Sequence, residues 1–272
     1  MVHSLSDVCA VLERLWPADG AESWDASGLV SGRLDAGIER IQLTVDVVAE
    51  TVDEAIDARA DLLLAHHPLL LRGVTTVAED RYKGALIARL IRADCALVAA
   101  HTNADVVADG TSAVFAELIG LHATGAIVDG SRPGTGIGRV GRFDEPTTLG
   151  RLARRIADIL PATAGGIRVS GDYDAAVNTV ALCAGAGDAY LSEDSVRSAD
   201  VYITSDLRHH PASEAREQAL LRGGPALIDV SHWASEWLWL RTAARQLQDE
   251  LPGVIVTISQ ARTDPWDFAI VQ

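Results

Sequence analysis

The sequence predicts an α/β fold made of two related α/β parts, in which mostly parallel mixed sheets are covered by helices. The first observation is that short apolar runs alternate with amphipathic segments of helical length from about residue 40 onward. The second is that His-His-Pro occurs twice, and each copy is followed by a histidine with an acidic residue four positions later. Alternation of this kind is typical of parallel strands joined by crossover helices. The repeated motif indicates an internal duplication.

The first part is expected to span residues 1–128 and to contain three strand-helix pairs. Its strands are largely apolar runs of six to eight residues, and its first helix carries acidic residues in its early turns. The expected strands are 41–46, 61–67 and 95–102, and the expected helices are 48–60, 81–94 and 110–121.

A glycine- and proline-containing stretch, DGSRPGT at 129–135, predicts a loop that joins the two parts. The second part is expected over residues 136–272, with the C-terminal segment packing back on the first part. Its expected strands are 138–143, 166–171, 179–185, 199–206, 226–231 and 253–259, and its expected helices are 148–160, 189–198, 212–221 and 234–251.

Composition restricts the classes of function. With 38 acidic and 23 basic residues the net charge is −15, which disfavours nonspecific binding to nucleic acid or to an anionic membrane. An anionic small-molecule substrate would need a local cation. The cysteines Cys9, Cys95 and Cys183 form no CxxC pair, and the N-terminus lacks the features of a secretory signal. No run is long enough to span a membrane, so a reducing, cytoplasmic setting is expected.

Histidines and acids gather just after strands, where α/β proteins usually carry their chemistry. His66 and His67 end one expected strand, and His101 ends the next, with Asp105 four residues later. In the second half, His232 and Glu236 have the same spacing, which places both on one face of a helix.

Imidazole and carboxylate ligands without thiolate suit zinc, iron or manganese. Adjacent histidines in an extended strand point in different directions, so the pattern favours two divalent ions per chain, held between the two parts.

Other features have simpler interpretations. His209 and His210 form the second His-His-Pro, and they are candidates for metal ligands, supporting hydrogen-bond donors or substrate contacts. His3 and His122 are expected on the surface. GIGRVG at 136–141 matches GxGxxG but precedes a strand, so a dinucleotide site is not expected. Three tryptophans near His232 are assigned to the core: Trp233, Trp237 and Trp239.

Six motifs in fixed order resemble the dinuclear-metal hexameric family of GTP cyclohydrolase I type 2 homologues. They are WDASGL, LTVDVV, LLLAHHP, HTNAD, TSDLRHH and DVSHWASE, and the match spans nearly the whole chain. The resemblance implies a toroidal homohexamer with a two-metal site facing an inner cavity. It assigns the ligands to His66, His67, Asp105, His232 and Glu236, the last as a bridge, with His101 as an additional candidate.

The chain departs from the family pattern in having Ala26 where asparagine is usual, and Thr-Asn-Ala between His101 and Asp105. Neither change removes a ligand. The short join at 129–135 leaves no room for the domain that some relatives insert.

Two cations would activate water, so hydrolysis is the leading class of reaction. In a cyclohydrolase the water would attack C8 of guanine in a nucleotide, with His101, His209 or His210 moving protons. The alternatives are a metal-dependent phosphoesterase and a non-enzymatic metal-binding scaffold ring.

Overall fold

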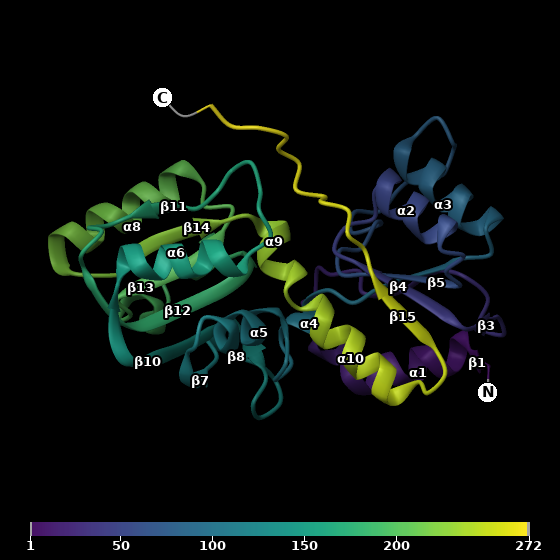
Figure 1. The fold of residues 1–272 in the computed structure, drawn as a ribbon, viewed down its shortest axis with the longest axis horizontal. Coiled ribbons are helices and arrows are strands. Elements are labelled where there is room, and N and C mark those ends of the chain that lie inside the picture. The colour runs from purple at the N-terminus through teal and green to yellow at the C-terminus, as the bar shows by residue number, and fades with distance from the viewer. Residues whose placement is uncertain (1, 271–272) are drawn as a thin grey trace. The chain divides into compact units, whose positions relative to one another are not determined.

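The computed structural model describes residues 2–270 and divides the chain into two compact units. Unit 1 comprises Met1–Val107 and Leu240–Thr263, and unit 2 comprises Ala108–Trp239 and Asp264–Gln272. Both are α/β units with one main mixed sheet each (Figure 1). The C-terminal helix and strand at Leu240–Thr263 therefore belong to the first unit.

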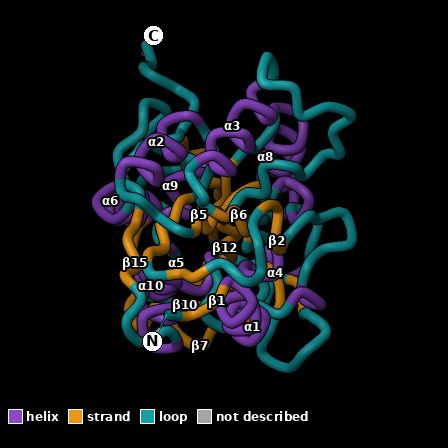
Figure 2. Tube along the Cα trace, turned by 90° about the vertical axis from the view of Figure 1, so that its right-hand side faces the viewer, coloured by secondary structure: helices purple, strands orange, loops and turns teal. Residues whose placement is uncertain are grey.

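Unit 1 is built on a five-stranded sheet. Its strand order is β15 (Ile255–Ile258), β4 (Arg40–Thr44), β5 (Leu62–Ala65), β6 (Ala96–Ala99) and β2 (Gly28–Ser31). Neighbours are parallel except β2, which pairs antiparallel with β6. Figure 2 shows β5, β6 and β2 side by side.

Helices cover both faces of the unit 1 sheet (Figure 1). One face carries α2 (Ala49–Asp57) and α3 (Tyr82–Arg92), and the other carries α1 (Leu5–Leu15) and α10 (Leu240–Glu250). The run Leu62–Leu64 is at most 1% exposed, because a central parallel strand is buried on both faces. Short elements complete the unit: β1 (His3–Ser4), η1 (Ala18–Gly20), β3 (Gly37–Ile38) and α4 (Thr102–Asp105).

Unit 2 is built on a six-stranded sheet. Its strand order is β11 (Arg168–Ser170), β14 (Ala226–Val230), β13 (Val201–Ser205), β12 (Ala176–Ala186), β10 (Arg139–Thr148) and β7 (His122–Gly125). Only the β12–β13 and β13–β14 pairs are parallel, so this sheet is more antiparallel than that of unit 1. The helices are α5 (Thr111–Leu118), α6 (Leu149–Ile159), α7 (Asp194–Arg197), α8 (His209–Arg222) and α9 (His232–Trp237), with η2 (Asp188–Tyr190).

Several element boundaries differ from those expected. The helix expected at 234–251 is two helices, α9 and α10, and the change of unit falls between them. The helix expected at 189–198 is reduced to η2 and α7. Asp129, at the start of the stretch expected as a loop, belongs to β8 (Val128–Asp129), and residues 130–135 connect it to β9 (Gly136–Ile137) in a small antiparallel hairpin. Unit 2 already begins at Ala108, because α5 and β7 pack on or in its sheet.

The two units share a local arrangement at the start of a central parallel strand. Before β5, Oδ2 of Asp61 accepts hydrogen bonds from the backbone N–H groups of Glu39 and Arg40, at 2.8 and 2.9 Å. Before β13, Oδ2 of Asp200 accepts from the backbone N–H groups of Asn178 and Thr179, at 2.9 and 2.7 Å. This likeness supports the hypothesis of an internal duplication.

Two further predictions from the sequence concern the burial of the cysteines and the absence of membrane-spanning segments. Cys95 and Cys183 are buried, as expected, and Cys9 is half-buried. Burial raises the pKa of the Cys95 thiol to about 12. Within residues 2–270, no helix has the length and apolar character needed to cross a membrane.

Candidate metal centre

Three imidazoles of unit 1 meet at the carboxyl ends of neighbouring parallel strands. His66 and His67 directly follow β5, and His101 follows β6 after one intervening residue. The ring centroids lie 5.1 Å (His66–His67), 5.3 Å (His66–His101) and 5.5 Å (His67–His101) apart. One nitrogen from each ring lies within 4.8 Å of the other two, a spacing at which the three can hold a metal ion.

The protein holds Nδ1 of each of these rings with an oxygen acceptor. Nδ1 of His66 lies 2.8 Å from the carbonyl oxygen of Ala100. Nδ1 of His67 lies 2.7 Å from Oδ1 of Asp46, and Nδ1 of His101 lies 2.7 Å from Oδ1 of Asp25.

A backbone carbonyl only accepts hydrogen bonds, so His66 carries its proton on Nδ1 and presents the lone pair of Nε2. A carboxylate favours the same tautomer in His67 and His101. This is the usual support for a metal-binding histidine, in which an oxygen acceptor fixes one nitrogen and the metal takes the other.

Asp105 lies beside this cluster at the last position of α4. Its Oδ1 is 3.7 Å from Nε2 of His66. The His66 side chain is fully buried and that of Asp105 is mostly buried. The structure therefore brings together four of the residues expected at the site, His66, His67, His101 and Asp105.

Sequence reasoning assigned no role to Asp25 or Asp46. Burial alone would raise the pKa of Asp25, but hydrogen bonds from His101, Thr102 and Ser27 outweigh it and hold that pKa well below its usual value. Asp25 precedes β2 and Asp46 follows β4, so the strands on either side of the β5–β6 pair supply the two carboxylates. The sequence signal that could have identified both residues is an acidic residue next to the end of a strand.

Unit 2 carries the other expected pair. Ser231 caps α9, its Oγ accepting from the backbone N–H of Ala234 at 3.2 Å, so His232 and Glu236 stand one turn apart. Nε2 of His232 lies 2.9 Å from Oε1 of Glu236, and the Glu236 side chain is 4% exposed. An imidazole and a buried carboxylate at this separation are a pair suited to share a cation.

Two features of unit 2 fix this pair. Oδ2 of Asp206 lies 2.7 Å from Nδ1 of His232, and the Asp206 backbone has φ of 57°, a conformation in which aspartate is among the better-tolerated residues. Burial alone would lower the pKa of His232, but the Glu236 carboxylate, together with Asp206, raises it well above its usual value. Gly185 is the second feature: a Cβ there would lie 2.4 Å from Oε1 of Glu236.

The remaining histidines lie elsewhere. His209 and His210 occupy the first turn of α8 with ring centroids 5.2 Å apart, and both are exposed. His209 lines a cavity of about 420 Å³ with Arg168, Arg216 and other residues. His122 is exposed, 3.4 Å from Oδ2 of Asp144, and His3 is half-buried, 3.4 Å from the carbonyl oxygen of Pro252.

The structure also shows where the tryptophans and the glycine motif GIGRVG lie. Trp233 and Trp239 are buried, as expected for core residues, and Trp237 is half-buried. Trp24, which had no expected role, is 59% exposed and meets the His101 ring edge-on at 5.8 Å. GIGRVG lies in β9 and the start of β10 and opens no helix.

The fold and these residues define a class of protein with two α/β units, each carrying candidate metal ligands just after the carboxyl ends of parallel strands. The chain belongs to the Duf34/NIF3 (NGG1p interacting factor 3) family, whose sequence profile matches residues 3–265.

Relatives are similar over nearly their whole length. A Streptomyces coelicolor protein named "GTP cyclohydrolase 1 type 2 homolog" is 47% identical over 270 residues, covering 96% of this chain and 93% of that protein. A Mycobacterium tuberculosis protein of the same name is 31% identical over 375 positions, covering 97% of each. Because this chain has 272 residues, the mycobacterial relative contains inserted segments that this chain lacks.

Solved structures show the same fold. A Bacillus cereus protein related to NIF3 superposes with a TM-score of 0.87 at 22% identity, covering 99% of this chain and all of that one. A Staphylococcus aureus hypothetical protein, SA1388, superposes with a TM-score of 0.87 at 26% identity, again covering 99% of this chain and all of that one.

Proposed function

We propose that this protein is a metal-dependent hydrolase that holds two divalent ions per chain and acts on a nucleotide such as GTP. Its ligands would be His66, His67, Asp105, His232 and Glu236. The observation that carries the proposal is the set of three imidazoles in unit 1, each with Nδ1 held by an oxygen acceptor. The names of the relatives support the cyclohydrolase type of reaction.

The donor set fits divalent zinc, iron or manganese. It combines imidazole nitrogens with carboxylate oxygens and includes no thiolate, because Cys95 and Cys183 are core residues. In this proposal unit 1 supplies His66, His67 and Asp105, and unit 2 supplies His232 with Glu236. We propose that the two sets complete one centre, with Glu236 as the shared ligand.

Two bound cations would lower the pKa of water and stabilise negative charge that develops in the transition state. The protein's own part is to position the donors. Asp46 and Asp206 fix the tautomers of His67 and His232, while the carbonyl of Ala100 fixes that of His66.

His101 is the candidate for proton transfer in this proposal. Its ring lies beside His66 and His67, and its Nδ1 is held by Asp25. An imidazole whose Nδ1 is held by a carboxylate can accept a proton at Nε2 and return it, which is the role of a general base and acid. His209 and His210 stay alternatives for this role.

A substrate panel tests the activity. The metal-loaded protein is incubated with GTP, with a dinucleotide and with a simple phosphodiester, each with and without chelator. We expect turnover of GTP that chelator abolishes and that His66→Ala loses. His122→Ala serves as the matched control and keeps full activity, because that histidine is exposed and far in sequence from the ligands.

The outcomes separate the candidates. Hydrolysis of the phosphodiester alone would replace the cyclohydrolase with a phosphoesterase. Metal binding without turnover of any substrate would favour the scaffold and overturn the proposed hydrolase.

A second experiment tests the proposal of one shared centre. Metal affinity is measured for His67→Ala, for His232→Ala and for the double variant. Because a shared centre couples its ligands, the losses in binding free energy should be non-additive. Additive losses would assign the two histidines to separate sites.

The resemblance to the hexameric family also leads us to propose a homohexameric ring. Multi-angle light scattering of the 28.8 kDa chain should then give six times the monomer mass. A monomer at micromolar concentration would overturn the ring while leaving the metal site to be tested by its own experiments.

A further inference from the structure

The C-terminal segment of unit 2, residues 264–270, exposes apolar side chains at every second position. Trp266, Phe268 and Ile270 are 67%, 77% and 78% exposed. They alternate with Asp267 and Ala269, a period of two that places them on one face of an extended chain. Figure 1 draws the segment as an extended yellow trace, and within the described residues it joins no sheet. Such a face is suited to bind along a strand edge or an apolar groove.

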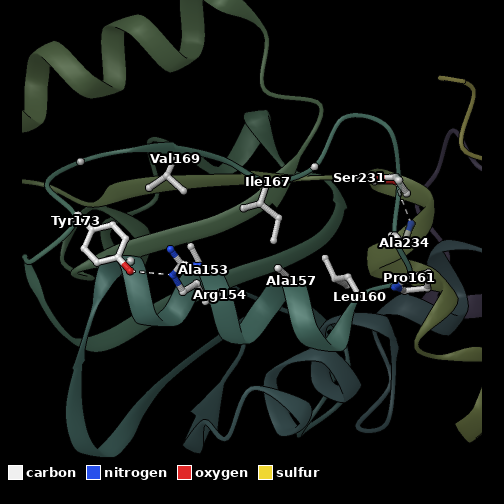
Figure 3. Close-up of a pocket in the computed structure, with 15 residues that line it drawn as sticks. Ala153, Arg154, Ala157, Leu160, Pro161, Ile167, Val169, Tyr173, Ser231 and Ala234 are labelled. Atoms are coloured by element: carbon white, nitrogen blue, oxygen red, sulfur yellow. Dashed lines mark hydrogen bonds between the residues drawn. The ribbon is translucent and has the colours of Figure 1, made fainter. Parts of the chain in front are cut away.

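Unit 2 also carries an open apolar groove of about 510 Å³ (Figure 3). Its walls include Ala153, Ala157 and Leu160 on and after α6, opposite Ile167 and Val169 in and beside β11. Arg154 and Tyr173 lie toward one end, joined by a 2.9 Å hydrogen bond, and Ser231 and Ala234 lie toward the other (Figure 3). The groove is thus bounded by a helix on one side and a sheet edge on the other.

This sheet edge is β11, the edge strand of the six-stranded sheet, which pairs with β14 on one side. Val169 in its middle is 43% exposed. An edge strand offers backbone N–H and C=O groups to an incoming extended chain, and such edges are usually protected or paired. Backbone pairing and an apolar groove are therefore available at the same place.

The segment begins at the end of this groove. Ser231, which lines the groove, donates a hydrogen bond from Oγ to Oδ1 of Asp264 at 2.6 Å. At about 3.3 Å per extended residue, Phe268 reaches about 13 Å and Ile270 about 20 Å from that point. The stretch of α6 from Gly150 to Leu160 is about 15 Å long, at about 1.5 Å per residue. The apolar part of the segment therefore matches the groove in length.

Charge is complementary as well. Residues 264–270 contain two carboxylates, Asp264 and Asp267, and no basic side chain. The residues that line the groove include one charged side chain, the guanidinium of Arg154. In a chain of net charge −15, a groove without carboxylates is a favourable place for an acidic segment.

We propose that the C-terminal segment of one copy of this chain docks in the α6–β11 groove of a second copy. In the structure the segment keeps Phe268 and Ile270 exposed although its start lies at the end of its own groove. Because each segment starts beside a groove, two copies related by a twofold axis can exchange segments reciprocally, an isologous contact that closes on itself. The occupant is thus a second copy of the chain.

Site-directed crosslinking tests this directly. In a Cys9→Ser background, copies with Phe268→Cys are mixed with size-tagged copies that carry Ala157→Cys, and disulfide formation is followed. We expect a crosslinked dimer of unlike chains. The matched control replaces Ala157→Cys by Leu220→Cys, an exposed apolar position on α8 that is not on the groove.

The alternatives give different products. Equal crosslinking at Leu220, or no crosslink at all, would overturn the docking. A chain that carries both cysteines and links only within itself on dilution would show that the segment closes its own groove, and would also overturn the exchange.

Light scattering provides a second readout. The double variant Phe268→Ser/Ile270→Ser and the groove variant Ala157→Arg should each lower the assembled mass, while Leu220→Ser/Leu221→Ser should not. All of these side chains are exposed, so unfolding temperature should stay close to that of the parent. Metal content should also be unchanged, which separates failure of this inference from failure of the proposed hydrolase. An unchanged mass in both test variants would contradict the inference.

Discussion

Nδ1 of His67 lies 2.7 Å from Oδ1 of Asp46, a carboxylate that the chain supplies from the end of the neighbouring strand β4. The hydrogen bond occupies Nδ1 and leaves the opposite ring nitrogen as the donor, in a ring whose centroid lies 5.1 Å from that of His66 and 5.5 Å from that of His101. A donor oriented in this way loses little freedom when it binds a cation, so the carboxylate behind it contributes to affinity without touching the metal.

Asp46→Asn should therefore weaken metal binding by about 10- to 100-fold while leaving the fold intact. The amide keeps the size of the side chain but removes the charge that favours the Nδ1 tautomer. Isothermal calorimetry with zinc or manganese measures the change. Asp144→Asn is the control, because Asp144 also faces a histidine, His122, but on the exposed surface. Equal affinity in Asp46→Asn and the parent would show that this hydrogen bond does not prepare a ligand.

Glu236→Gln should damage the metal site much more than His122→Ala, although each change removes one ionisable group. The Glu236 carboxylate is 4% exposed and lies 2.9 Å from Nε2 of His232. Losing its charge would leave the repulsion between two cations less compensated. Calorimetric titration reads both affinity and stoichiometry, and unchanged values in Glu236→Gln would remove this residue from the ligand set.

Gly185→Ala should disturb the same carboxylate from the other side. Gly185 has φ of 72°, and an added Cβ would lie 2.4 Å from Oε1 of Glu236 and 3.3 Å from Nε2 of His232. We expect a loss of stability of about 1–2 kcal/mol from the backbone conformation and, in addition, weaker metal binding. Gly134→Ala serves as the control for the backbone contribution, because Gly134 has φ of 78° with open space around it. Chemical denaturation and metal titration of both variants distinguish the two causes; equal metal affinity in both would argue against a close approach at Gly185.

Asp200 should give unit 2 an acid-sensitive contribution to stability. Burial raises the pKa of Asp200, but hydrogen bonds from the backbone N–H groups of Thr179 and Asn178 and from the Thr179 hydroxyl outweigh it and lower that pKa. A carboxyl whose pKa is lower in the folded state stabilises the fold fully above its unfolded pKa, about 3.9, and loses that contribution as pH falls through the folded value. Urea unfolding of Asp200→Asn should show a deficit of about 1 kcal/mol at pH 7 that shrinks below pH 4. A deficit that does not change with pH would exclude the ionised carboxylate as its source.

Much of the fold could be predicted because its strands are short apolar runs bounded by polar residues. Leu62–Ala65 and Val201–Ser205 read as buried strands and are buried strands. The boundary between units could not be read in the same way. The chain first passes from unit 1 to unit 2 between Val107 and Ala108, and that position depends on which sheet α5 and β7 pack against. It returns to unit 1 between α9 and α10, inside a sequence that shows one continuous apolar pattern.

The candidate site could be predicted from the sequence where its candidate ligands are neighbours along the chain. His66 and His67 are adjacent, and four positions on a helix bring Glu236 to His232. Asp25 and Asp46 were missed because they reach His101 and His67 across the sheet, 76 and 21 residues away in sequence.

The repeated His-His-Pro was a misleading guide to equivalent positions. Ala65 pairs with Ala99 at the end of β5, as Ser205 pairs with Val230 at the end of β13. The residue that follows is His66 in unit 1 and Asp206 in unit 2. By sheet register, Asp206 of unit 2 therefore occupies the position that corresponds to His66 of unit 1. His209 and His210 come three and four residues later, in the first turn of α8, so they do not correspond to His66 and His67.

The central claim, two divalent ions per chain held by these histidines and carboxylates, is tested most directly by metal stoichiometry. Protein purified without chelator is reconstituted with zinc, iron or manganese, freed of excess metal and analysed for metal and protein content. We predict two ions per chain in the parent and in His122→Ala, and a clear loss in His66→Ala and Glu236→Gln. A content of one ion or none in the reconstituted parent would contradict the account.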